Sequence, residues 1–482
     1  MSESENSVRL TEKEAERREM MLGGDMMKVL VTIALPLVFY NSIGQIFQLI
    51  DTYIAANMSA AVVSTVSFVA QVDKMVMAIG SGLSIAGGVM IARSYGKGDM
   101  EKVRRQISTV FFICIGIGSL ILLVMVPLMY PFLKLMRMPD ELIGQGTIYS
   151  SLVMASVIFQ FINTIYFSIQ KSKGNTKVIM WGNLLVLFVK TSMNILTMAL
   201  IKNGKIEVGN GIYFLPVATL LSHFVLTTIA MKNFTSKKNP FRISIKNCEF
   251  KKTLLLPLFS LGLPVFLEKF IMAFGKSIVN ALCAGFGPTV VGALGVSDRI
   301  CGMATNPISG FQEAESSLVS NNLGNRNLNR ALSFFYRTLL LNLSFTIVVF
   351  VITGVLKNPI IEAFAKGDSN FAGEIDKIYF YERLDTLLVS VNSSVMGLLY
   401  GFGKTKITMF LNLLRLFVYR IPPLLIFMKV PFFFDTLGTS AVGLAMLISN
   451  SLVGLTAGIV AAAFIKRIKN ADSQRLTESI EI

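Results

Sequence analysis

Long apolar runs, separated by short polar connections, make up most of this chain. Each is about 20 residues or longer, enough for a helix to cross the roughly 30 Å hydrocarbon core of a bilayer. Leu, Ile, Val, Phe and Met fill the runs without the period-two alternation of a membrane β-barrel. The pattern therefore predicts twelve transmembrane helices, at residues 27–54, 60–92, 106–133, 143–170, 178–201, 212–231, 253–283, 289–320, 332–356, 376–401, 407–428 and 440–465.

The second half of the chain repeats the first. At an offset of 228 residues (264 − 36), Pro36 aligns with Pro264 and Gly96 aligns with Gly324. A duplication this long, in a chain this hydrophobic, predicts two lobes that face each other across a central space. We therefore expect an all-α integral membrane protein with two six-helix lobes, related by a pseudo-two-fold axis along the membrane normal.

The domain boundaries follow from the apolar runs and the connections between them. The predicted N-lobe covers 27–231 and the C-lobe covers 253–467, with a basic linker at 232–252. The tails are 1–26, for which a short helix and a disordered segment are both open, and 468–482.

Charge sets the expected orientation. The chain is 53% apolar and 15% charged, with a net charge of +16, whereas soluble domains carry about 25% charged residues. Most of the lysines and arginines of the connections fall on the side that holds both termini. The positive-inside rule makes that side cytoplasmic in a plasma (inner) membrane. Because the basic residues are scattered over loops, nucleic acid is not an expected partner.

Few residues suit metal or redox chemistry. Cys114, Cys248, Cys283 and Cys301 show no paired spacing, and His223 is the only histidine. We expect no metal, no cofactor and no enzymatic activity, because a membrane enzyme acting on lipids needs a catalytic histidine, a metal cluster or an acid pair. A phosphate-binding glycine motif of the Walker type is also missing.

Charged residues inside the predicted spans are the candidate functional groups. An isolated charge at mid-bilayer costs at least about 2.5–3.5 kcal/mol, so these side chains must pair or face a wet interior. A helix rise of about 1.5 Å per residue places Asp51, Asp73, Lys190, Asn194 and Thr219 together in the outer half of the first lobe. Simple structural pairing, for example of Asp73 with Lys190 or Lys74, is the alternative.

The second lobe carries its own set of intramembrane charges. The candidates for a substrate cavity are Glu268, Arg299, Asp385, Arg415 and Arg420. Glu313 and Glu315 also fall within a predicted span, but the sequence suggests no role for them.

Two prolines mark candidate hinges, because proline inside a helix removes a hydrogen bond and clashes with the preceding turn. Pro36 lies fifteen residues (51 − 36) before Asp51, so a titratable carboxylate shares its helix. Pro264 repeats the proline in the second lobe, where Val279 replaces the acid. A tolerated kink, common in membrane helices, is the alternative.

These motifs resemble those of the multidrug and toxic compound extrusion (MATE) family of prokaryotic transporters over about residues 27–467. Arg415 followed by Pro422 is similar to its DinF-like branch. The resemblance implies H⁺- or Na⁺-driven export of amphipathic, usually cationic compounds by alternating access. It rests on Ala34-Leu-Pro36, Asp51-Thr52, Gly82-x4-Gly87 and Ala92-x3-Gly96 in the first half, and on Gly262-Leu-Pro264, Arg299, Pro307, Gly310 and Asn322-Leu-Gly324 in the second.

The resemblance also implies roles for single residues. Asp51 matches the family's coupling-ion aspartate, Asn194 and Thr219 match two other residues of that site, and Met198 replaces a second aspartate. Lys190, one turn from Asn194, favours H⁺ over Na⁺ as the coupling ion. We expect a monomeric antiporter for small molecules, drugs or toxins. The open alternative is a flippase for lipid-linked oligosaccharide or another anionic lipid-like substrate, to which the basic candidates are suited.

Overall fold

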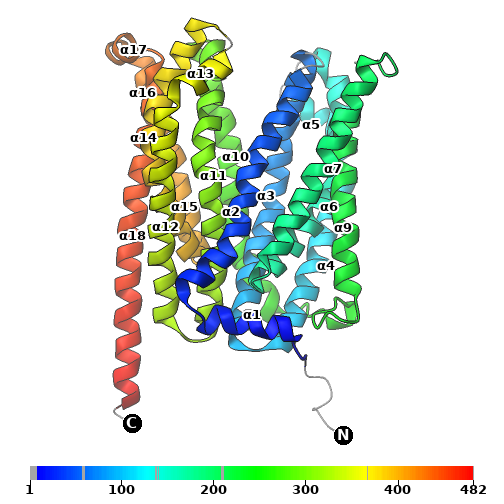
Figure 1. The fold of residues 1–482 in the computed structure, drawn as a ribbon, viewed down its shortest axis with the longest axis vertical. Helices are drawn as coiled ribbons and strands as arrows, with labels where there is room; N and C mark the ends of the chain where they lie inside the picture. The colour runs from blue at the N-terminus through cyan, green and yellow to red at the C-terminus, as the bar shows by residue number, and fades with distance from the viewer. Residues whose placement is uncertain are drawn as a thin grey trace.

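The structure is a computed structural model that describes residues 8–56, 60–135, 138, 140–207, 211–365 and 367–480, without the side chains of 45, 48–64, 67, 288 and 472–480. Within those ranges the chain is helical and contains no strand. Figure 1 shows the long helices upright in two groups, one from each half of the chain, with both ends of the chain at the same end of the molecule. We call this the termini end.

The first half begins with a short helix, α1, which lies across the termini end (Figure 1). Its helices are α1 (Glu12–Gly23), α2 (Met26–Ala56), α3 (Ala60–Lys97), α4 (Met100–Met125), α5 (Met129–Leu135), α6 (Asp140–Ser172), α7 (Thr176–Lys202) and α9 (Phe214–Thr235). A connection containing the short helix η1 (Ile245–Asn247) leads to the second half.

The second half repeats the order of long helices. They are α10 (Lys252–Cys283), η2 (Ala284–Phe286), α11 (Pro288–Gly324), α12 (Leu328–Val355), α13 (Lys357–Ala365), α14 (Ser369–Gly401), α15 (Thr405–Leu413), η3 (Leu414–Val418), α16 (Ile421–Lys429), α17 (Pro431–Leu437) and α18 (Ser440–Ile480).

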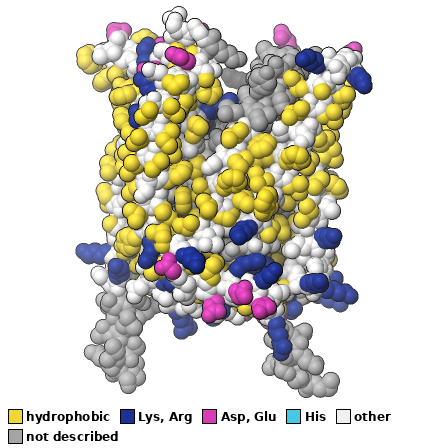
Figure 2. Space-filling view, in the orientation of Figure 1, with side chains coloured by type: hydrophobic (Ala, Val, Ile, Leu, Met, Phe, Trp, Pro, Cys, Tyr) yellow, Lys and Arg dark blue, Asp and Glu magenta, His cyan; other side chains and the backbone are white. Residues whose placement is uncertain are grey.

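The predicted twelve membrane-spanning helices are confirmed. Ten segments of the described chain are long and apolar enough to cross a membrane. The remaining two are α11 and α14, which are long but carry several charged residues. Both pack against many other helices, so they need no lipid-compatible surface all round. In Figure 2, hydrophobic side chains cover the middle of the visible face, and charged side chains gather towards its ends.

Two elements differ from simple continuous spans. The span expected at 407–428 is interrupted by the π-helical turn η3, between α15 and α16. Pro422 and Pro423 follow this turn, and their missing amide hydrogens prevent regular hydrogen bonding to the preceding turn. The last helix continues past residue 467 to Ile480.

The sequence repeat reappears in the local structure. Asp99 and Asn327, 228 residues apart (327 − 99), are the N-caps of α4 and α12. Their side chains accept hydrogen bonds from the amides of Lys102 at 3.1 Å and Arg330 at 3.0 Å. Such caps satisfy amides that have no partner within the helix. The same short motif therefore starts the equivalent helix in each half.

Glycine allows the two halves to meet backbone to backbone. A β-carbon at Gly82 would lie 2.7 Å from the carbonyl oxygen of Gly262, and one at Gly310 would lie 2.6 Å from the amide nitrogen of Val38. Because no side chain fits there, α3 lies directly against α10, and α11 lies directly against α2. These reciprocal contacts are the geometry that a pseudo-two-fold axis between the halves produces.

The hydrophobic core is continuous between the halves towards the termini end. Leu318 and Val319 of α11 and Phe334 of α12 are fully buried in the same cluster as residues of α2, α3, α4 and α6. A separate cluster fills the part of the second half farther from that end, and it is formed by residues of α10, α11, α13, α14, η3, α16 and α18. The interface between the halves is thus tightly packed at the termini end.

Candidate functional site: a cavity between the two halves

A cavity of about 460 Å³ lies between the two halves. Residues of α2, α3, α6, α7 and α9 form one side, and residues of α10, α11 and α14 form the other. Ser172 and Tyr400, at or near the ends of α6 and α14, are among its lining residues, so the cavity lies in the half of the molecule nearer the termini end. The wall mixes hydroxyl, amide and charged groups with apolar side chains such as Leu37, Met77 and Phe167.

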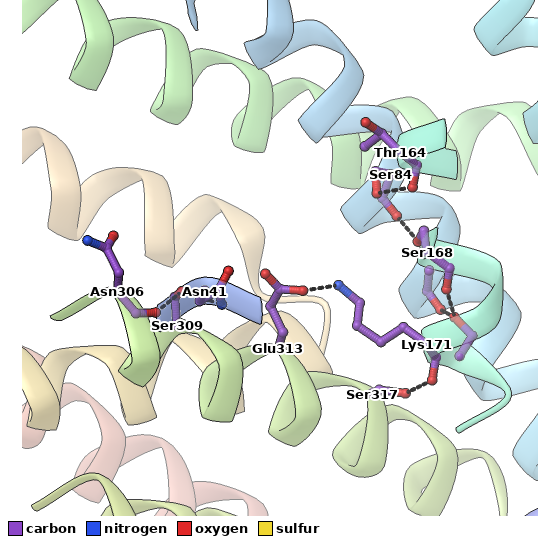
Figure 3. Close-up of polar contacts among 11 residues, drawn as sticks. Asn41, Ser84, Thr164, Ser168, Lys171, Asn306, Ser309, Glu313 and Ser317 are labelled. Atoms are coloured by element: carbon purple, nitrogen blue, oxygen red, sulfur yellow. Dashed lines mark hydrogen bonds and ion pairs between the residues drawn. The ribbon is translucent and has the colours of Figure 1, made fainter. Parts of the chain in front are cut away.

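Serine hydroxyls hold α3 and α6 together along one wall. Ser168 donates to the carbonyl of Ser84 at 2.6 Å, and Ser172 donates to the carbonyl of Gly88 at 2.9 Å. Ser84 in turn donates to the carbonyl of Thr164 at 3.4 Å (Figure 3). Small hydroxyl side chains permit this close approach and leave polar groups along the cavity.

A second polar contact crosses from one half to the other. The side-chain amide of Asn41 on α2 donates to the hydroxyl oxygen of Ser309 on α11 at 3.0 Å. Ser309 donates to the carbonyl of Asn306 at 2.6 Å (Figure 3). Ser81, the repeat equivalent of Ser309 (309 − 81 = 228), also lines the cavity. Both halves therefore contribute the same hydroxyl position.

An ion pair joins the halves at the cavity. The Nζ of Lys171 on α6 lies 2.8 Å from the Oε2 of Glu313 on α11, and the two side chains are 20% and 45% exposed (Figure 3). Ser317 donates to the carbonyl of Lys171 at 2.9 Å, and Asn321 donates to the carbonyl of Ser172 at 3.1 Å. These contacts link the end of α6 to α11 between the cavity and the termini end.

Lys269 on α10 and Tyr400 on α14 line the cavity from the second half and share one buried partner. Glu268 accepts hydrogen bonds from the hydroxyl of Tyr400 at 2.6 Å and from Thr408 at 2.9 Å. The ammonium of Lys269 lies 3.4 Å from the same carboxylate. Glu268, a sequence candidate for the substrate cavity, thus lies behind the wall and positions two residues of its surface.

His223 also lines the cavity, beside Asn163. The side-chain amide of Asn163 donates to the backbone carbonyl of His223 at 3.0 Å, and Thr227 donates to the Oδ1 of Asn163 at 3.1 Å. These bonds fix α9 against α6. In the part of the chain that the structure describes, no three His, Cys, Asp or Glu residues are arranged to hold a metal ion.

The candidates of the first lobe lie on α2, α3, α7 and α9. Asp73 interacts electrostatically with Lys190 and forms a hydrogen bond with Gln160, which lines the cavity. Asn194 is buried on α7, and the hydroxyl of Thr219 donates to the carbonyl of Leu215 at 3.2 Å.

Asp51 belongs to α2, but its side chain lies outside the described residues. The structure thus brings Asp73 and Lys190 together and connects them with the cavity through Gln160.

Asn450 organises most of the candidates of the second lobe. Its side-chain oxygen accepts hydrogen bonds from Arg415 at 2.8 Å and Arg420 at 2.9 Å, and its amide donates to Asp385 at 2.6 Å. The π-helical turn η3 holds Arg415, and Arg420 directly follows Tyr419 after that turn. Arg299 is an exposed residue of α11.

The two candidate hinge prolines are buried within α2 and α10. Pro36 directly precedes Leu37, which lines the cavity. Pro264 lies two residues after Gly262, which contacts α3 at Gly82. Both prolines therefore occupy helices that form the interface between the halves.

Sequence reasoning missed the pair that joins the halves. Lys171 falls among the basic residues of a connection, and Glu313 falls in a span without a visible partner. The two are 142 residues apart in the chain, so only the packing of α6 against α11 brings them together. The single sequence signal for this pair was the presence of an acidic residue, Glu313, inside a predicted span.

Comparisons with known proteins agree on the family. The MatE family model matches residues 36–196 and 264–426, one segment in each half. The chain is 21% identical over 381 residues to the probable multidrug resistance protein YoeA of Bacillus subtilis, covering 77% of this chain and 78% of that protein. It is 22% identical over 407 residues to the probable multidrug resistance protein NorM of Thermotoga maritima, covering 84% and 86%.

Solved structures share the fold. A crystal structure of a MATE protein in complex with MaL6 superposes with a TM-score of 0.87 at 18% identity, covering 96% of this chain and all of that chain (100%). A transporter of the MOP superfamily from Pyrococcus furiosus, described as having a binding pocket of reverse polarity, gives 0.87 at 18% identity over 96% and 99%. The repeat, the twelve helices and the matched segments together show that the chain is a multi-pass membrane protein of the MatE family of multidrug and toxic compound extrusion transporters.

Proposed function

We propose that this protein is a secondary active antiporter that exports amphipathic or cationic small molecules in exchange for H⁺, or Na⁺, by alternating access. The observation that carries the proposal is the cavity between the halves, closed off from the termini end by the Lys171–Glu313 pair and its neighbouring hydrogen bonds. The relatives named for multidrug resistance support the choice of cargo.

Alternating access requires the contacts at one end of the cavity to break while those at the other end form. The bonds between α6 and α11 suit that role, because they are few, polar and made between two rigid helices from opposite halves. Opening of this end would expose the cavity to the side of the membrane on which the termini lie. We propose that this side is the cytoplasm and that the membrane is the plasma membrane.

The wall of the cavity suits an amphipathic cargo. Phe167, Leu226 and Ile179 offer apolar surface, and hydroxyl and amide groups offer hydrogen bonds. Among the described lining residues, Glu313 is the one acid. A cationic cargo would compete with Lys171 for this carboxylate and so weaken the contact between α6 and α11. Binding of cargo would then favour the change of conformation.

The coupling ion is proposed to act in the first lobe. Asp51, Asn194 and Thr219 are the residues carried over from the family pattern, and Asp73 and Lys190 interact electrostatically in the same half. The link from Asp73 through Gln160 to the cavity gives protonation a physical connection to cargo binding. The two halves in one chain form the whole proposed pathway, so a monomer is sufficient.

Transport by the purified protein in liposomes tests the function. Ethidium, a fluorescent cation, is the probe, and pH and sodium gradients are imposed separately. We expect ethidium movement driven by the pH gradient, strongly reduced in Glu313→Gln. The matched control is Glu101→Gln, which removes an ion pair with Arg104 on the surface of α4 and leaves transport unchanged. Absence of ethidium movement under both gradients in the wild-type protein would overturn the proposal.

A further inference from the structure

Glu315 on α11 carries a carboxylate that does not line the cavity. Its side chain is fully buried, and neither of its oxygens has a hydrogen-bond partner among the described residues. It lies between α11 and α14, because a β-carbon added at Gly397 would be 2.5 Å from its Oε2. A carboxylate that is ionised in such a place has neither water nor a countercharge to stabilise it. The geometry therefore calls for a bound cation on the carboxylate.

Among the side chains that the structure describes, no positive group forms a hydrogen bond with Glu315. Lys171 on α6 pairs with Glu313, whereas Lys269 on α10 pairs with Glu268. Arg93 on α3 donates to the carbonyl of Gly401 at 3.4 Å. The titratable groups of α2, α12 and α14 near this level also have other partners: Tyr40 interacts with Glu313, Arg330 donates to Gly24, Arg337 contacts the sulfur of Met26, and Tyr400 donates to Glu268.

The tight packing decides which cation fits. Backbone atoms of α14 lie against the carboxylate at Gly397, and Glu315 does not line the cavity described above. A sodium ion needs a shell of several oxygen ligands, whereas a proton needs no added volume. The contact at Gly397 thus favours a proton over a sodium ion as the cation bound to Glu315.

A row of buried polar side chains leads away from Glu315 along α14. Glu382, Thr386, Ser390 and Ser394 follow one another at intervals of four residues, which places them on one face of the helix. All four are buried, and Ser394 lies three residues from Gly397. The row therefore runs along α14 from Glu382 to the level of the Glu315 carboxylate.

Neighbouring helices add polar groups to this row. The side-chain amide of Asn342 on α12 donates to the hydroxyl of Ser394 at 2.8 Å, and its Oδ1 has no partner among the described residues. Ser297 on α11 donates to the carboxylate of Glu382 at the other end of the row. Thr386, Ser390 and Ser394 each donate to a backbone carbonyl one turn earlier on α14. Hydroxyl groups can both accept and donate, so passage of a proton along the row requires water between these hydroxyls.

We propose that Glu315 is a proton-binding site of the second half and that the hydroxyl groups of α14 connect it with Glu382. This inference rests on the proposed H⁺-coupled function and places a second proton site far from Asp51 in the chain. The carboxylate takes up one proton to become a neutral acid in the conformation described here. It returns that proton to water when movement of α11 against α14 exposes it.

Infrared difference spectroscopy of the purified protein tests the protonated state directly. We expect a carboxylic-acid C=O band that disappears in Glu315→Gln and persists in Glu313→Gln, the control two residues away on the same helix. Glu315→Asp provides a second variant, in which the band shifts in frequency. A wild-type spectrum identical to that of Glu315→Gln, or a band that sodium removes at constant pH, would overturn the proposal.

Transport separates this site from the function as a whole. In liposomes, Glu315→Gln is expected to lose pH-driven ethidium accumulation while ethidium exchange without a gradient continues. If the wild-type protein moves no ethidium, the proposed function fails. The infrared spectrum still shows whether the carboxyl group of Glu315 is protonated. Unchanged pH-driven accumulation in Glu315→Gln would contradict its role as a coupling site.

The row on α14 has its own test. Ser390→Ala is expected to slow the shift of the Glu315 band after transfer to D₂O, because it interrupts the row. Ser333→Ala, at an exposed serine on α12 that also donates to a backbone carbonyl, is the matched control. Equal exchange rates in the two variants would show that the proton reaches Glu315 by another path.

Discussion

Gly96 and Gly324, which are 228 residues apart (324 − 96), make the same contact from opposite halves of the molecule. A β-carbon on Gly96 would overlap the carbonyl oxygen of Asn321, and one on Gly324 would overlap that of Arg93. Arg93 and Asn321 are themselves repeat equivalents, since 321 − 93 is also 228. The ends of α3 and α11 therefore cross with backbone in contact at the termini end, and no side chain fits between them.

Side chains at these two glycines are expected to force the halves apart. Gly96→Val and Gly324→Val should each destabilise the closed termini end by roughly 1–3 kcal/mol, because the added atoms overlap backbone that cannot move alone. Thermal unfolding in detergent measures the loss. Gly458→Ala on α18 is the control, since a β-carbon there meets nothing within 4 Å. Equal melting temperatures for Gly96→Val and the control would refute the tight crossing.

A buried ion pair fastens α1 to the first half. The Nζ of Lys173 lies 3.0 Å from the Oε1 of Glu14, with side-chain exposures of 6% and 11%. Glu14→Leu leaves a buried ammonium without its partner, at an expected cost of about 3–5 kcal/mol. The double variant Glu14→Leu/Lys173→Met should recover much of this stability. A double variant less stable than Glu14→Leu would contradict this account.

The same pair predicts a pH dependence. Burial lowers the pKa of Lys173 below its ordinary value of 10.5, and the Glu14 carboxylate opposes that shift. Between its folded pKa and 10.5 the unfolded chain binds more protons than the folded protein, so stability rises with pH in that window. Glu14→Leu removes the carboxylate that stabilises the charged Lys173. The loss of stability relative to the wild type should therefore be largest at pH values where Lys173 is charged in the folded variant, and it should shrink towards alkaline pH. Melting temperatures over a pH series measure this trend, which a constant deficit would exclude.

Contacts of α1 with both halves indicate a further effect of these variants. Arg18 donates to the carbonyl of Tyr95 at 2.9 Å in the first half, whereas Asn322 of the second half donates to the carbonyl of Met21 at 3.4 Å. Loss of the Glu14–Lys173 pair should therefore increase the chemical accessibility of residues at the termini end, in addition to lowering the melting temperature.

The pair between Lys171 and Glu313 predicts a charge-swap rescue. Because these side chains are partly exposed, losing the attraction should change stability by only about 0–1 kcal/mol. Lys171→Glu should nevertheless open the contact between α6 and α11 by repulsion, and Lys171→Glu/Glu313→Lys should close it again. The measurement is maleimide labelling of Ser316→Cys, a cavity residue, in a protein without its four native cysteines. Labelling that does not respond to the swap would separate this pair from closure.

The hydrogen bonds of Asn450 make the stability of the second half's polar interior depend on this one side chain. Asn450→Leu removes bonds to Asp385, Arg415 and Arg420 together, and hydrogen bonds to charged groups contribute about 1.5–3 kcal/mol each. We expect a large loss of thermal stability. Ser449→Ala removes a single bond from Arg420 at 3.1 Å and should cost much less. Similar melting temperatures for the two variants would contradict the central position of Asn450.

Sequence and structure agree on the large-scale organisation for a simple reason. Apolar length specifies a membrane helix without reference to any partner, and the spacing of Pro36 and Pro264 records the duplication. Because the two halves contain equivalent helices, each half can bury the same helix surface against the other. This explains the reciprocal contacts of Gly82 and Gly310. The π-helical turn η3 was not predictable to the residue, although Pro422 and Pro423 mark its neighbourhood.

Pairing within the membrane was decided by the tertiary structure. The sequence itself determined twelve spans, the twofold repeat and which charges had to avoid lipid, because burial in hydrocarbon penalises charge wherever it occurs. It did not determine that Lys171 meets Glu313, that Glu268 accepts a hydrogen bond from Tyr400, or that Glu315 finds no hydrogen-bond partner within the described part of the chain. Those outcomes depend on the rotation and crossing of helices distant in the chain, and the close glycine contacts between the halves fix both.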